Sequence, residues 1–119
     1  MAGGGIPSSH IHVGISNMLT IITLMLMAWA ATPTQGERVY ATSKCSMCHS
    51  IAGKGNPKGS LDGVGAHLSA EEIRLWLTDP AQMRSRTGAT RKPEMKSFAS
   101  LPKEDLDALI TYLLTLKAH

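Results

Sequence analysis

Residues Cys45-Ser46-Met47-Cys48-His49 form the pattern C-x-x-C-H. This spacing is typical of c-type haem attachment, in which two thiols bond to the two vinyl groups of one haem. The imidazole that follows the second cysteine is then placed to bind the iron as an axial ligand. We therefore predict that Cys45 and Cys48 carry one haem covalently and that His49 is an axial iron ligand.

Three other interpretations of the cysteine pair are a thioredoxin-like redox dithiol, half of a zinc site and a structural disulfide. A redox dithiol belongs to a βαβ context, and no strand-like alternation surrounds this motif. A zinc site needs four ligands, yet Cys45 and Cys48 are the only cysteines in the chain. Haem attachment is the favoured interpretation, and the other three stay open at this point.

The front of the chain is apolar and carries no formal charge. All 12 Lys and Arg and all 9 Asp and Glu lie after Gln35. Residues 13–31 would make a helix of about 28 Å, close to the hydrocarbon thickness of a bilayer. Ala28-Trp29-Ala30 also resembles the small-x-small site at which a signal peptide is cleaved. We interpret residues 1–31 as a signal peptide or an N-terminal membrane anchor, and favour cleavage because the most apolar part is short for a span.

Both interpretations export the rest of the chain, so we expect residues 32–119 to form one domain on the periplasmic side. A chain of this size has little surface to bury and usually needs a stabilising device such as a metal or a disulfide. Aromatic residues make up only 4% of the chain. A covalently attached haem would supply the apolar surface that the side chains lack.

Three helices are predicted. The first, residues 36–44, leads into the haem motif. The second opens with a capping box of Ser69 and Glu72 and ends at Asp79-Pro80. The third begins near Pro102 and carries an apolar stripe at helical spacing, formed by Leu106, Leu109, Ile110 and Leu113. We predict two irregular stretches between them, a Gly-rich loop over residues 50–67 and a segment without visible period over residues 81–100.

The second irregular stretch contains Met95, which follows Pro93 and lies between the haem motif and the last helix. Haem iron in electron carriers is often bound by His on one side and Met on the other, which raises the reduction potential. We predict that Met95 is the second axial ligand. Met83 is the alternative thioether and His67 the alternative imidazole, and a packing role is the other interpretation of Met95.

Taken together, these elements resemble the class I cytochromes c, the small monohaem electron carriers of bacteria and mitochondria. The resemblance covers roughly residues 36–117. It implies an all-α cytochrome c fold, in which three main helices and long loops wrap around one covalently attached haem. It also implies Cys45 and Cys48 as thioethers, with His49 and Met95 as the axial ligands. The resemblance rests on Gly36 with Tyr40, Cys45-Ser46-Met47-Cys48-His49, Leu61-Asp62-Gly63-Val64-Gly65, Glu71-Glu72-Ile73 with Trp76, Asp79-Pro80, Lys92-Pro93 with Met95, and Tyr112-Leu113.

The chain departs from that family at one position. Family members usually have a proline just before the Leu-x-Gly element, and its carbonyl accepts the proton of the proximal imidazole. Gly59-Ser60 stand in its place here. A backbone carbonyl is still expected to serve, so the departure bears on the rigidity of the loop and the tuning of His49.

The expected function is that of a one-electron carrier that cycles between Fe(III) and Fe(II), not an enzyme, because both axial positions would be filled. One alternative is a haem subunit tethered to a larger respiratory or photosynthetic complex, which a retained anchor over residues 13–31 would favour. A haem enzyme such as a peroxidase is the other, and it would need an open sixth position.

Charge indicates the kind of partner. The formal net charge is +3, and several cations lie in the two irregular stretches: Lys54, Lys58, Arg84, Arg86, Arg91, Lys92 and Lys96. They are expected to surround the exposed haem edge and to meet acidic redox proteins, with a merely solvated surface as the alternative. Membrane association would come through residues 13–31. Nucleic-acid binding is not expected, because no recognition motif or interleaved aromatic residue accompanies the basic charge.

Overall fold

The computed structural model describes residues 3–5 and 32–117. The predicted signal peptide or anchor, including the cleavage site at Ala28-Trp29-Ala30, lies outside the described residues, and its fate stays a prediction. Within the described ranges, no helix has the length and apolar character needed to cross a membrane.

Helix α2 (Gln35–Thr42) leads into the haem motif, as predicted, and starts at a capping box. The Thr34 hydroxyl accepts a hydrogen bond from the Glu37 amide at 3.2 Å, and the Glu37 carboxylate accepts one from the Thr34 amide at 2.7 Å. These reciprocal bonds satisfy two amides that the first helical turn would otherwise leave unpaired.

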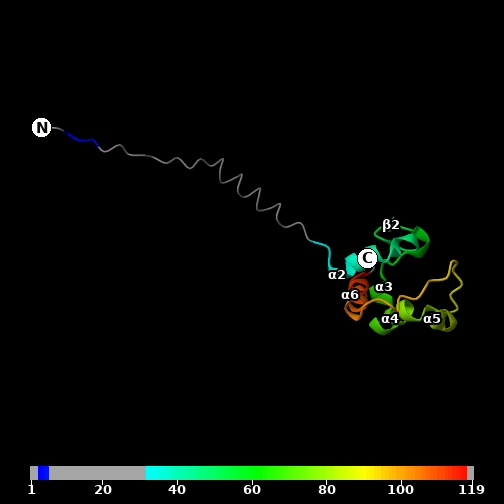
Figure 1. Cartoon of the computed structure of the whole chain (residues 1–119). Coiled ribbons are helices and arrows are strands. Elements are labelled where there is room, and N and C mark those ends of the chain that lie inside the picture. The colour runs from blue at the N-terminus through cyan, green and yellow to red at the C-terminus, as the bar shows by residue number, and fades with distance from the viewer. Residues whose placement is uncertain (1–2, 6–31, 118–119) are drawn as a thin grey trace. The chain divides into compact units, whose positions relative to one another are not determined.

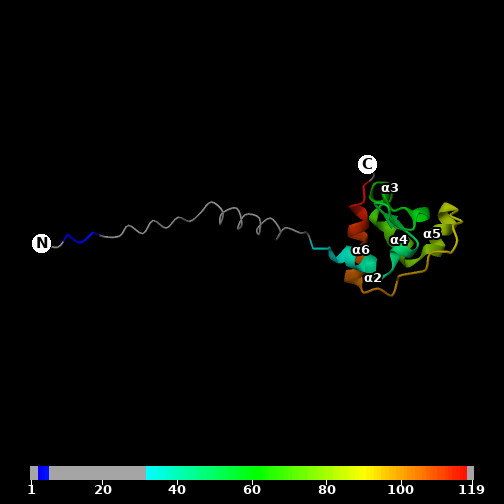
Figure 2. The same ribbon diagram turned by 90° about the horizontal axis from the view of Figure 1, so that it is seen from above.

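The last helix, α6 (Lys103–Leu114), crosses α2, and the two form the most extensive contact between elements (Figures 1 and 2). Gly36 makes this crossing close, because a Cβ at that position would collide with the Ala108 carbonyl and the Tyr112 Cβ. Next to it, the rings of Tyr40 and Tyr112 meet edge to face, with centroids 6.1 Å apart. The crossing therefore depends on a position without a side chain, and an aromatic pair supports it.

Helix α4 (Ala70–Thr78) confirms the predicted capping box, since the Ser69 hydroxyl accepts from the Glu72 amide at 3.2 Å. The helix ends before Pro80, as predicted. The prediction of an irregular segment over residues 81–100 is wrong in its first part, where α5 (Pro80–Thr87) forms.

Helix α5 is specified by its ends. The Asp79 carboxylate accepts from the Gln82 amide at 3.1 Å, Pro80 fills the first turn, and Gly88 closes the helix at a φ of 71°. Only Pro80 and Met83 are buried in it. With so few buried positions the helix shows no apolar period, which is why its pattern predicts nothing.

The prediction of a Gly-rich loop over residues 50–67 is wrong in part, because four short elements form within it. Strands β1 (Ser50–Ile51) and β2 (Lys54–Gly55) form an antiparallel pair in which Ser50 lies opposite Gly55. The 3-10 helix η2 (Pro57–Gly59) and helix α3 (Val64–His67) follow. The described part is thus mostly helical with very little strand, which confirms the all-α fold class.

The core is aliphatic and lies where α2, α4 and α6 meet (Figure 2). It includes all four residues of the stripe predicted for α6, and Leu109 has no exposed surface. The buried members are Val39, Ile73, Leu77, Leu106, Leu109, Ile110 and Leu113. Tyr40, Met95 and Phe98 pack against this cluster from its edge and are half-buried.

We predict that Gly36→Ala destabilises the native protein by about 1–3 kcal/mol, because the added methyl forces α2 away from α6. Chemical denaturation followed by far-UV circular dichroism measures the change. Ala41→Ser, which adds one atom at an exposed position of the same helix, is the control and should cost about 0.5 kcal/mol or less. Equal, small losses in the two variants would contradict the close-packed crossing.

Candidate functional site

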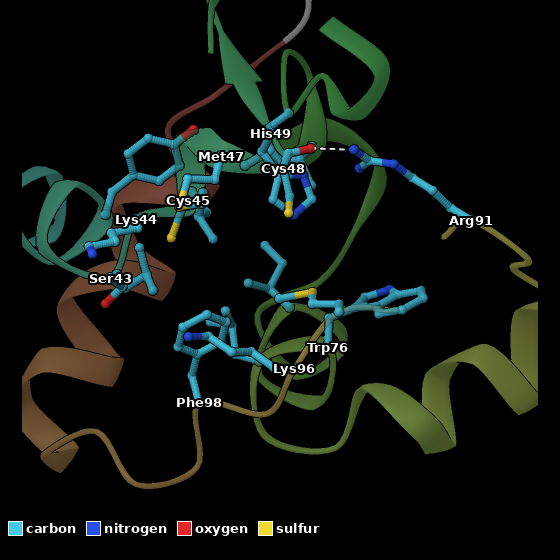
Figure 3. Close-up of a pocket in the computed structure, with 18 of the residues that line it drawn as sticks. Ser43, Lys44, Cys45, Met47, Cys48, His49, Trp76, Arg91, Lys96 and Phe98 are labelled. Carbon is cyan, nitrogen blue, oxygen red and sulfur yellow. Dashed lines mark hydrogen bonds between the residues drawn. The ribbon is translucent and has the colours of Figure 1, made fainter. Parts of the chain in front are cut away.

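An apolar cavity of about 500 Å³ lies beside the core. Cys45, Cys48 and His49 lie on one side of it, and Trp76, Lys96 and Phe98 lie across from them (Figure 3). Aliphatic core residues, among them Leu109 and Leu113, form part of the wall. This volume falls within the range of about 300–1,000 Å³ that is common for ligand and cofactor sites.

The 3-10 helix η1 (Cys45–Met47) brings the two thiols to the same cavity. Lys44 precedes it in the left-handed conformation, at a φ of 57°, and turns the chain out of α2. The Cys45 carbonyl then accepts from the amides of Cys48 at 3.1 Å and His49 at 2.9 Å. A single tight turn therefore holds both cysteines and the histidine against one space.

The environment of the thiols disfavours two of the alternative interpretations. Burial raises the pKa of the Cys45 thiol to about 11, whereas a redox dithiol of the thioredoxin kind depends on a lowered pKa. Over the described ranges, no group of three or more His, Cys, Asp and Glu side chains could hold a metal ion, which leaves a zinc site without its other ligands.

His49 is oriented by Gly59, which belongs to the Gly59-Ser60 pair that stands where the resembling family usually has a proline. Its Nδ1 lies 2.9 Å from the Gly59 carbonyl oxygen, and because a carbonyl only accepts, Nδ1 donates. Burial lowers the pKa of His49, so the ring is neutral at neutral pH and keeps a lone pair on Nε2. A neutral imidazole held in this way is suited to bind a metal through Nε2.

The three candidates for the second axial ligand differ in their positions. Met95 is half-buried and lines the cavity. Met83 is buried in α5 with 4% of its surface exposed, and His67 is exposed in α3. Neither Met83 nor His67 is part of the cavity wall. The geometry thus favours Met95 among the three, and its role as a ligand stays a prediction.

Helix α5 holds the start of the Met95 segment. Arg84 of α5 forms an ion pair with Glu94 at 3.1 Å and donates to the Met95 carbonyl at 3.4 Å. Lys92 pairs with the other oxygen of the same carboxylate at 2.6 Å. The hydrogen bond from Lys92 and the charge of Arg84 lower the pKa of Glu94, so it is ionised at neutral pH.

The end of the segment is held by α4. The Ser97 hydroxyl donates to the Thr78 carbonyl at 2.8 Å, and the Phe98 amide donates to the Leu77 carbonyl at 2.6 Å. These bonds occupy carbonyls that the last turn of α4 would leave free. Met95 is therefore held between two anchored points, although its own stretch is irregular.

A further contact was not predicted from the sequence. Arg91, in the same irregular segment, donates to the Cys48 carbonyl at 2.5 Å (Figure 3). The pattern marked Arg91 only as one of several surface cations, since no local signal relates it to a residue 43 positions earlier.

The residues of the cavity fit a haem. The wall is mostly apolar, two thiols and an imidazole lie on one side, and a thioether is part of the same wall. The phenolic oxygen of Tyr40, another wall residue, is buried without a hydrogen-bond partner in the part of the chain that the structure describes. Soft thioether sulfur and imidazole nitrogen are the donors that haem iron takes in electron carriers.

Comparison with known proteins agrees with this geometry. Over 92 residues the chain is 27% identical to cytochrome c oxidase subunit 2 of Alkalihalophilus pseudofirmus. That match covers 70% of this chain and 25% of the relative, so the chain spans about a quarter of the length of the curated protein it matches. The family model described as cytochrome c matches residues 33–117, which include every residue of the cavity wall. The chain belongs to the cytochrome c family.

Proposed function

We propose that the protein is a one-electron carrier whose single haem is attached covalently to Cys45 and Cys48. The observation that supports this most directly is the composition of the cavity wall, where the C-x-x-C-H motif and Met95 enclose one apolar space. A bound haem would supply reversible one-electron cycling between Fe(III) and Fe(II).

His49 and Met95 have the proposed role of axial ligands. Both are neutral donors. Burial lowers the pKa of His49 and keeps its ring neutral, and the hydrogen bond to the Gly59 carbonyl places the proton on Nδ1, which leaves Nε2 free. Trp76, Phe98 and the aliphatic residues make the wall beside them mostly apolar. His49 and Met95 would together hold the iron of a bound haem and would leave no position on it for a substrate, which suits a carrier rather than an enzyme.

We propose acidic redox proteins as partners, met at the cavity mouth. Lys44, Arg91 and Lys96 are exposed and belong to the cavity wall. Met47, between the two cysteines, has 70% of its surface exposed. An apolar centre with cations around it suits brief contact with an acidic surface, because charge speeds the encounter and the small apolar area keeps it short-lived.

A second candidate is a haem domain that works inside a larger respiratory complex on the exported side of the membrane. The observation that favours it is the similarity to an oxidase subunit. The chemistry at the haem would be the same, and the difference lies in whether residues 13–31 are retained.

Covalent attachment is tested by extraction with acidified organic solvent. We predict that haem stays with the polypeptide of the native protein and enters the solvent from the Cys45→Ala, Cys48→Ala double variant. Absorption spectra of the two phases measure this. Haem in the solvent phase of the native protein would overturn the attachment. His49→Ala should yield little folded protein, because the small core then loses its organised centre.

Axial ligation is tested by Met95→Ala against two matched variants. We predict that Met95→Ala removes the weak long-wavelength sulfur-to-iron band of the ferric protein, lowers the reduction potential and opens the iron to carbon monoxide. Met83→Ala should keep that band while costing about 2–5 kcal/mol of stability, as for other buried methionines. His67→Ala should change neither. Unchanged band and potential in Met95→Ala would return Met95 to a packing role.

The two settings are separated by the N-terminus of the mature protein. We predict cleavage after Ala30, so that intact mass spectrometry of native protein gives a start at Ala31 and osmotic release yields it in soluble form. Protein that stays with membranes in high salt and begins before residue 13 would favour the tethered haem domain. The retained N-terminal segment would then limit partners to proteins within its reach.

A further inference from the structure

Arg91 links the segment that carries Met95 to the opposite side of the cavity. Its guanidinium donates to the Cys48 carbonyl at 2.5 Å (Figure 3). Cys48 precedes His49 directly, so this bond acts on the backbone from which the imidazole projects. Arg91 is an exposed residue, but its guanidinium has a hydrogen-bond partner within the protein, the Cys48 carbonyl.

Gly59 explains why the guanidinium fits there. A Cβ on Gly59 would collide with the Arg91 guanidinium and with the Cys48 carbonyl. Gly59 is not among the glycines with positive φ, so its backbone conformation does not require glycine. The position therefore needs glycine for space, and Arg91 fills part of the space that a side chain would take.

The same glycine holds the proximal imidazole, since its carbonyl accepts from His49 Nδ1 at 2.9 Å. Arg91, Cys48, Gly59 and His49 thus form one connected group. In this group the planar fork of the guanidinium reaches the Cys48 carbonyl while it lies against Gly59, a geometry that a lysine ammonium cannot reproduce.

We propose that Arg91 is a positioning residue for His49, which fixes the Cys48 and Gly59 backbone around the imidazole and places a permanent positive charge on its proximal side. Gly59-Ser60 and Arg91 then work as a pair: the arginine supplies the rigidity that a proline ring at this point would provide in the family. The proposal rests on the proposed role of His49 as an iron ligand.

Two effects follow for the oxidised and reduced states. The ferric site carries one more positive charge than the ferrous site, so a nearby cation disfavours it. A well-held Gly59 carbonyl keeps the Nδ1 proton in place, which sets the basicity of the ligand. Loss of the charge favours oxidation, and loss of the hydrogen-bonded frame loosens the Nδ1 proton.

The experiment uses haem-loaded native protein and its Arg91→Ala, Arg91→Lys and Arg91→Gln variants. In a fixed redox buffer, Arg91→Ala and Arg91→Gln should raise the ratio of oxidised to reduced protein about threefold, which is roughly 30 mV for a one-electron couple. Exchange of the His49 Nδ1 proton with solvent, followed by NMR in the ferrous state, should become about tenfold faster in Arg91→Ala. This corresponds to a tenfold larger equilibrium constant for breaking the hydrogen bond to Gly59. Arg91→Lys should restore the ratio in large part but not the exchange rate.

Arg86→Ala is the matched control. Arg86 is an exposed arginine of α5 that is not part of the cavity wall, although its charge was expected near the haem edge, and within the ranges described it makes no hydrogen bond to residues 45–49. Its loss removes the same charge and should change neither measurement. Gly59→Ala adds a second route to the same result, since the methyl displaces the guanidinium and should reproduce the faster proton exchange.

A purely structural brace gives a different result. If Arg91→Ala lowers the melting temperature but leaves the redox ratio and the proton exchange at native values, the proposal is overturned. Should Arg91→Ala fold poorly, the milder Arg91→Gln variant decides the question by the same two measurements. Failure of the proposed function would be recognised separately, because the native protein itself would then lack covalent haem.

Discussion

The constraint on which the structure depends is one apolar cavity that must be filled. Leu109 and Leu113 belong both to the core and to the cavity wall. The packing of the core helices therefore depends on what the cavity contains. The wall of the cavity is mostly apolar, and apolar surface contributes about 25 cal/mol to stability for each Å² that is removed from water. A bound group that covers this wall therefore stabilises the same helices that form the core.

Much of the fold could be predicted because its signals are local. The capping box of Ser69 and Glu72, the Asp79-Pro80 stop and the stripe of α6 each act within a few residues, and all three are observed. Helix α5 could not be predicted from periodicity, because an apolar period reflects burial and this helix buries only Pro80 and Met83. Its ends did carry a signal, an Asp-Pro start and a closing glycine at residue 88, which specify a helix without any apolar face.

The candidate site also has one part that the sequence predicts and one part that it does not. The C-x-x-C-H motif is a local signal of five residues, so it indicates a haem wherever it lies in a chain. Arg84 and Arg91 could not be distinguished from other cations by pattern, since their partners are set by tertiary structure. Arg84 was grouped with the surface charges, yet only 21% of its side chain is exposed and it pairs with Glu94. Some cations of this chain are solvated surface charges and others, such as Arg84 and Arg91, bind partners within the fold. Only the folded structure distinguishes the two kinds.

The irregular segment between α5 and α6 has a consequence for access to the cavity. Of its residues, Met95, Phe98 and Leu101 are half-buried and the others are exposed. Segments with so little buried surface open at a fraction of the free energy of global unfolding. This segment is therefore the part of the cavity wall that local unfolding opens at the lowest cost. The hydrogen bonds that such an opening breaks are those of Arg84, Arg91, Ser97 and Phe98.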